Sequence, residues 1–172
     1  MNQQLRAKKV RELLNKFAVK NNNYSVNELR IILAIERIIA RLSSDVILED
    51  HLIYKGGFVM MKTIGSDRFT RDLDALGFGI EKEDVARLVP LALEKKLDDG
   101  FWFGDIKIKQ MDEQGEYGAF RFDCAYQIGE PEIHKIPKLS RIHFDVGFGD
   151  KIPSKIKQIQ SDSILPGEDK LS

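Results

Sequence analysis

The segment 141–148 alternates apolar and polar side chains more regularly than any other part of the chain. Alternate positions hold the two kinds: Ile142, Phe144, Val146 and Phe148 on one side, and Arg141, His143 and Asp145 on the other. Successive side chains of a strand point to opposite faces, so this pattern predicts a strand with one buried face. We therefore expect a sheet that is covered on one side and carries Asp145 on the other.

The remaining chain predicts further strands and several helices. Strands are expected at 51–55, 71–78, 106–111 and 117–128, the last two as a hairpin about a turn at 113–115. Helices are expected at 4–19, from Ser25 to about Leu42, at 58–64, and at 81–98 with a kink at Pro90. Ser25 and Glu28 form a capping-box pattern. The simplest fold is α+β, a mixed sheet with helices on one side, with a helical segment at 1–45 and a core at 46–172.

Two aspartates, Asp72 and Asp74, lie one residue apart in a predicted strand, so both carboxylates are expected on one face. Two like charges held that close repel each other unless a cation lies between them. Mg²⁺ prefers oxygen ligands and is commonly held by one or two carboxylates together with substrate phosphates. The pair therefore predicts a Mg²⁺ or Mn²⁺ site.

A glycine pair, Gly56-Gly57, precedes a predicted helix and predicts a turn whose backbone N–H groups approach a phosphate. Gly65-Ser66 is a weaker candidate, because too few residues separate it from Asp72 for a helix and a return loop. Lys55 stands beside the glycine pair and either contacts phosphate or caps the strand end.

Two arginines, Arg68 and Arg71, flank the acidic pair. They either bind a triphosphate or RNA phosphate, or balance the charge of nearby acids. His143 shares the predicted face of Asp145, where a structural, hydrogen-bonded histidine is favoured over proton transfer. Asp123 alternates with Arg121 on a polar strand face, where cross-strand ion pairs are expected.

Asp145 is a candidate third acid of the metal site. If its strand lies beside the strand of Asp72 and Asp74, three carboxylates converge, as in two-metal sites for phosphoryl or nucleotidyl transfer. Asp72 and Asp74 would bind metal, and Asp145 would bind the catalytic metal and help to deprotonate the acceptor hydroxyl. An isolated Asp-x-Asp is usually only a solvated strand end, so the glycine pair and Asp145 carry this hypothesis.

Three spaced motifs resemble the AbiEii/AbiGii nucleotidyltransferase toxin family over roughly residues 30–172. They are Lys55-Gly56-Gly57, Arg68-Phe69-Thr70-Arg71-Asp72-Leu73-Asp74, and Asp145-Val146-Gly147-Phe148-Gly149-Asp150. The resemblance implies a DNA polymerase β-like nucleotidyltransferase fold, with Gly56 and Gly57 as the phosphate turn, Asp72 and Asp74 as the metal pair, and Asp145 as the third acid. It also implies use of an NTP, transfer to an RNA (tRNA in some members) or protein acceptor, and a co-encoded antitoxin.

Two features depart from the pattern that this family implies. Phe58 follows the glycines where many nucleotidyltransferases have Ser or Thr, so a hydroxyl contact to phosphate is lost. Family members usually continue into a helical region bearing a Lys and a further Asp, which this chain, ending at Ser172, is expected to lack. The alternative is therefore a non-catalytic or truncated nucleotide- or antitoxin-binding module. A metal-dependent nuclease or phosphatase using the same acids is a third hypothesis.

Composition narrows these alternatives only slightly. Lys plus Arg equal Asp plus Glu at 27 each, so no overall basic charge indicates a nucleic-acid partner. The single cysteine, Cys124, excludes an internal disulfide and a cysteine-based zinc site. No apolar run approaches the ~20 residues of a membrane span, and we expect a cytoplasmic protein without a membrane partner.

Overall fold

A computed structural model describes residues 2–20, 23–64, 69–111, 118–149 and 164. The predictions for Gly65-Ser66, Arg68, the turn at 113–115 and nearly all of 151–172 lie outside these residues.

A five-stranded mixed sheet forms the centre of the fold, in the order β1-β2-β5-β4-β3. Its strands are β1 (Leu52–Lys55), β2 (Leu73–Gly77), β3 (Phe101–Met111), β4 (Ala119–Ile128) and β5 (Arg141–Phe148). β2 and β5 run parallel, and every other neighbouring pair is antiparallel. The predicted mixed sheet is therefore confirmed, and β5 has the bounds that its alternation predicts.

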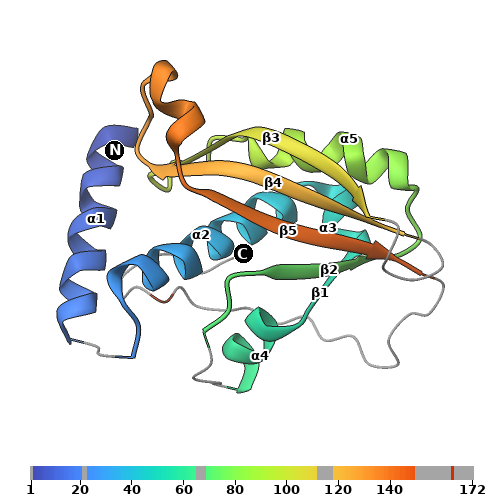
Figure 1. The fold of residues 1–172 in the computed structure, drawn as a ribbon, viewed down its shortest axis with the longest axis horizontal. Coiled ribbons are helices and arrows are strands. Elements are labelled where there is room, and N and C mark those ends of the chain that lie inside the picture. Colours follow the sequence, from blue (N-terminus) through green and yellow to red (C-terminus); the bar gives the residue numbers. More distant parts are fainter. Residues whose placement is uncertain (1, 21–22, 65–68, 112–117, 150–163, 165–172) are drawn as a thin grey trace.

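The helices lie largely on one side of this sheet. They are α1 (Gln3–Lys20), α2 (Val26–Ser43), α3 (Val46–His51), α4 (Gly57–Ile64) and α5 (Lys82–Leu93), with a 3₁₀ helix, η1 (Ile133–Lys138). Figure 1 shows α2, α3 and α5 behind the strands. The capping box begins α2 as predicted, because Ser25 Oγ accepts from the Glu28 N–H and Glu28 accepts from the Ser25 N–H.

The apolar face of the sheet forms one hydrophobic core with the helices. Phe122 of β4 stacks on Phe144 of β5 with ring centroids 5.1 Å apart, and both side chains are fully buried. The same cluster includes Ile35 of α2 and Val10 of α1, so the N-terminal helices share the core of the sheet. Covering this face leaves the opposite, polar face of β2 and β5 for the acidic side chains.

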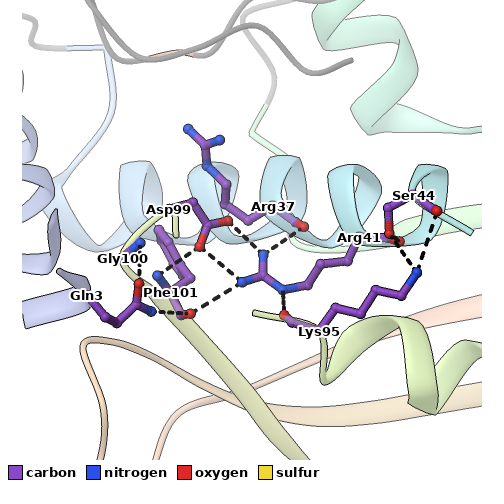
Figure 2. Close-up of polar contacts among 8 residues, drawn as sticks. All are labelled: Gln3, Arg37, Arg41, Ser44, Lys95, Asp99, Gly100 and Phe101. Atoms are coloured by element: carbon purple, nitrogen blue, oxygen red, sulfur yellow. Dashed lines mark hydrogen bonds and ion pairs between the residues drawn. The ribbon is translucent and has the colours of Figure 1, made fainter. Parts of the chain in front are cut away.

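A buried ion pair ties α2 to the connection between α5 and β3 (Figure 2). The Arg41 guanidinium donates to both carboxylate oxygens of Asp99, at 2.7 and 3.0 Å, and its Nε donates to the Lys95 carbonyl at 3.1 Å. It also lies 4.6 Å from the centre of the Phe103 ring. These contacts compensate for burying the guanidinium and fix where β3 begins.

A second buried acid connects α4 to the same helix. Glu36 of α2 is fully buried and forms an ion pair with Lys62 of α4, and it also accepts from the Ile164 N–H at 2.8 Å. Phe58 of α4 is buried beneath Lys62. The residue that replaces the usual Ser or Thr therefore anchors α4 to the core.

The predicted helix boundaries need two corrections. Residues 46–51 form α3, which was not predicted; Asp45 caps it by accepting from the N–H groups of Ile47 and Leu48, both at 3.0 Å. α5 ends at Leu93 rather than at residue 98, because the chain then turns toward the buried Asp99.

The strand boundaries need two further corrections. β3 begins at Phe101 rather than 106, and its pairing with β4 is irregular between Gly104 and Lys107, where Asp105 has a φ of 48°. β2 begins at Leu73 rather than 71, so Asp72 precedes the strand instead of belonging to it.

Candidate functional site

The parallel pairing of β2 with β5 places Asp74 directly beside Asp145. The neighbouring Leu73 and Phe144 are buried, so both acids lie on the face opposite the core. The prediction required these two strands to be neighbours, and that requirement is met. Two acids far apart in the sequence thereby become adjacent in space.

A row of five charged residues crosses the whole sheet, one from each strand. In strand order these residues, the charged row, are Lys55, Asp74, Asp145, Arg121 and Lys109, each in register with the next. Residues opposite one another in a sheet share a face. The carboxylates of Asp74 and Asp145 therefore lie side by side, with Lys55 next to Asp74 and Arg121 next to Asp145.

A cleft of about 380 Å³ opens over the acidic part of this row. Its lining residues are Lys55, Gly56, Asp74, Ala75, Asp145 and Gly147. Four residues predicted from sequence therefore border one cleft: Lys55, Gly56, Asp74 and Asp145.

Asp145 is bound by an arginine from the adjacent strand. Arg121 Nε donates to Asp145 Oδ1 at 2.8 Å, and Arg121 Nη2 donates to Oδ2 at 3.0 Å. The hydrogen bond to Asp145 raises the pKa of Arg121 above its usual value. The sequence predicts a cross-strand ion pair for Arg121 but does not identify Asp145, one of the candidate acids, as its partner.

Arg141, a second arginine on this face of the sheet, forms the ion pair that is predicted for Asp123. Arg141 Nε donates to Asp123 Oδ1 at 2.6 Å, and its Nη1 donates to Asp105 at 2.9 Å. Asp123 is thereby neutralised by a strand neighbour, as expected, and belongs to a separate ion-pair network from Asp145.

Asp74 carries a negative charge that its surroundings disfavour. Burial raises the pKa of its carboxyl above the usual value, the nearby Asp145 raises it further, and Lys55 partly opposes the rise. A divalent cation between Asp74 and Asp145 would remove their mutual repulsion, so the donor set is chemically suited to one.

The glycine pair allows the chain around β2 to approach the start of α4. Gly56 has a φ of +85°, and a Cβ there would lie 2.9 Å from Asp74 Oδ2. A Cβ on Gly57 would lie 3.2 Å from Thr70 Oγ1. The predicted turn opening a helix is confirmed, since the Gly56 carbonyl accepts from the Met60 N–H at 3.1 Å. The missing side chain of Gly56 makes room for Asp74 and that of Gly57 for Thr70, and the role of both glycines toward phosphate stays a prediction.

Asp72 lies just before β2 and pairs with a histidine of β5. Its side chain is 60% exposed, and Oδ1 lies 3.2 Å from Nε2 of His143 on β5. Within the described ranges, no three His, Cys, Asp or Glu side chains are grouped so that they could hold a metal ion. The structure thus brings Asp74 and Asp145 together and leaves Asp72 paired with a histidine.

Residues 37–169 match the family described as nucleotidyl transferase AbiEii toxin, Type IV TA system. The chain belongs to the AbiEii family. The match begins within α2 and includes all five strands and the cleft. No match to a curated protein is found.

The AbiEii description names a nucleotidyl transferase and the toxin of a toxin–antitoxin system, which implies a co-encoded antitoxin. The five-stranded α+β arrangement is consistent with a nucleotidyltransferase-like fold.

Of the two flanking arginines of the AbiEii chain, only Arg71 lies in the described part. It is exposed, and its guanidinium carbon lies 5.6 Å from the centre of the Phe69 ring. Arg71 therefore lies before β2 at the surface, and its contact with a phosphate stays a prediction.

Over the described portions of this AbiEii protein, none of the helices is both long and apolar enough to cross a lipid bilayer.

Proposed function

We propose that this AbiEii protein is a divalent-metal-dependent nucleotidyltransferase that transfers a nucleotide from an NTP to an RNA or protein acceptor. The observation that carries the proposal is the in-register pair Asp74 and Asp145 beside a cleft that Lys55 and Gly56 also line. Membership of a nucleotidyl transferase family supports the reaction class.

Asp74 and Asp145 are the residues that would hold Mg²⁺ or Mn²⁺, with the exposed Asp72 as the proposed third ligand. Their oxygens are of the type that these ions prefer, and burial together with the nearby Asp145 raises the pKa of the Asp74 carboxyl, so that a bound cation would favour its charged form. When bound, the metal neutralises phosphate charge and activates the attacking oxygen.

The other residues of the cleft would bind the nucleotide. Lys55 is an ammonium at the edge of the cleft and suits the triphosphate oxygens. Gly56 and Gly57 carry no side chain that would keep a phosphate from the backbone N–H groups at the start of α4. Asp145 would orient the acceptor hydroxyl and accept its proton.

The test is incorporation of labelled NTPs, in the presence of Mg²⁺, into total RNA and into a protein extract. Asp74→Asn and Asp145→Asn should each lower incorporation by about a hundredfold or more, because each removes a carboxylate charge that would hold the metal. Asp84→Asn is the matched control, since Asp84 is an exposed acid on α5 that pairs with Arg87. Equal incorporation by the native chain and both site variants would contradict the proposal.

A second candidate is a non-catalytic module that binds a nucleotide or an antitoxin. It is favoured by the engagement of Asp145 with Arg121 and by the pairing of Asp72 with His143. Calorimetry with each NTP and Mg²⁺, run beside the incorporation assay, separates the two candidates. Binding without incorporation into any acceptor supports the module.

A further inference from the structure

We propose that Arg121 is an internal counter-cation that occupies Asp145 in the free protein and competes with a divalent metal for that carboxylate. The inference rests on the proposed function, because it concerns the same acid. It adds a residue that controls when the site accepts metal.

The geometry of the pair supports competition. Arg121 uses two N–H groups to bind both oxygens of Asp145, at 2.8 and 3.0 Å, and paired charge-assisted bonds of this kind are among the strong ones. The Asp145 side chain is only 13% exposed. A metal ion approaching that carboxylate therefore meets a positive charge already bound to it.

The register of the sheet places Arg121 where this competition is unavoidable. In the charged row, Asp145 has Asp74 on one side and Arg121 on the other, so the arginine neutralises the acid farther from Lys55. Metal that binds between Asp74 and Asp145 must share Asp145 with Arg121 or displace it. Either route lowers the affinity for metal alone.

The arginine side chain is free enough to be displaced, since it is 36% exposed. A nucleotide triphosphate entering with the metal offers the guanidinium another anion, which planar arginine groups bind well. Metal without nucleotide offers no such replacement. Arg121 thereby favours joint binding of metal and nucleotide over binding of metal alone.

The test is calorimetric titration of the full chain with Mn²⁺ and with Mg²⁺, without nucleotide. Arg121→Gln and Arg121→Met should tighten metal binding by about tenfold or more, because an adjacent unit charge is worth at least that factor. Arg121→Lys keeps the charge and should bind metal nearly as weakly as the native chain. Lys109→Gln is the control, because Lys109 carries the next positive charge of the row and pairs in register with Arg121 rather than with Asp145.

Circular dichroism and melting temperatures establish that each variant is folded. Two neutral variants, Arg121→Gln and Arg121→Met, are used so that the test still stands if one of them fails to fold. Unchanged or weaker metal binding by the neutral variants would overturn the inference and leave the proposed function standing. Failure of every protein to bind metal, even with an NTP present, would overturn both. Tighter binding by Lys109→Gln equal to that by Arg121→Gln would also overturn it, since the effect would then be one of general charge.

Discussion

Asp74 is the residue at which charge and burial oppose each other most clearly. Burial and the nearby Asp145 raise the pKa of its carboxyl in the folded protein. The folded state therefore binds a proton on Asp74 more tightly than the unfolded chain does. The resulting stabilisation is present below the unfolded pKa and is lost as the pH rises through the raised folded pKa.

Asp74→Asn should consequently raise the melting temperature of the metal-free protein at pH 7. We expect a small gain, roughly 2 °C, because solvent screens part of the repulsion. The gain should vanish in acid, where the native carboxyl is protonated. Thermal melts from pH 3 to 8, with Asp84→Asn as the control, measure it; a variant less stable than the native chain at pH 7 would contradict the prediction.

Single residues also show how far sequence reasoning reaches. The two-residue period of strands predicts that Asp145 faces away from the core, and the structure confirms it. The same reasoning misplaces Asp72, because β2 begins one residue after it and the period no longer applies. Arg121 could be predicted to form an ion pair, but its partner depends on the register of β4 with β5, which local pattern does not determine.

At the scale of elements, the Arg41–Asp99 pair joins α2 to the start of β3 (Figure 2). Removing the carboxylate charge leaves a fully buried guanidinium without its counter-charge, which is more costly than never having buried the pair. The link should therefore dominate the stability of this junction.

Asp99→Asn should lower the free energy of unfolding by about 3 kcal/mol. Asp98→Asn is the matched control, because Asp98 is the exposed neighbour and asparagine tolerates its φ of 51°. Urea unfolding followed by circular dichroism measures both. Equal midpoints for the two variants would show that the buried pair contributes little.

Elements with long, regular patterns are predicted from sequence, and short or interrupted ones are not. The capping box and apolar residues of α2 locate that helix within a residue or two. α3 has only six residues, too few for a helical period to be visible. The first part of β3 was missed because Gly104 and Asp105 interrupt its alternation, although the strand pairs with β4 on both sides of them.

At the scale of the whole molecule, Cys124 reports on the integrity of the core. It is the single cysteine of the chain, it is fully buried in β4, and burial raises the pKa of its thiol to about 12. Because the folded thiol pKa is raised, its contribution to stability is present at neutral pH and is lost as the pH rises toward about 12.

Iodoacetamide should therefore label Cys124 at pH 8 only as fast as the core opens. We expect native Cys124 to be labelled at least about a hundredfold more slowly than the thiol of free glutathione. Once urea unfolds the chain, the two thiols should be labelled at comparable rates. Mass spectrometry of the alkylated chain measures the rates. Native labelling as fast as that of glutathione would contradict the buried position of the thiol.

The fold class follows from the sequence, since alternating strands among amphipathic helices predict an α+β protein and the sheet is mixed. The strand order does not follow, because it depends on contacts between segments far apart in the chain. That order decides which side chains share the charged row, and so it decides that Asp145 meets both Asp74 and Arg121.

The parallel contact between β2 and β5 also bears on the order of folding. β1, α4 and β2 are close in sequence, so the Gly56 turn and Asp74 can come together early and locally. Asp145 joins it only when β5 pairs with β2, a contact that closes a long loop and is therefore slow to form. A nascent chain that still lacks β5 holds Asp74 without its partner acid, and we expect the acidic pair to be among the last features that folding completes.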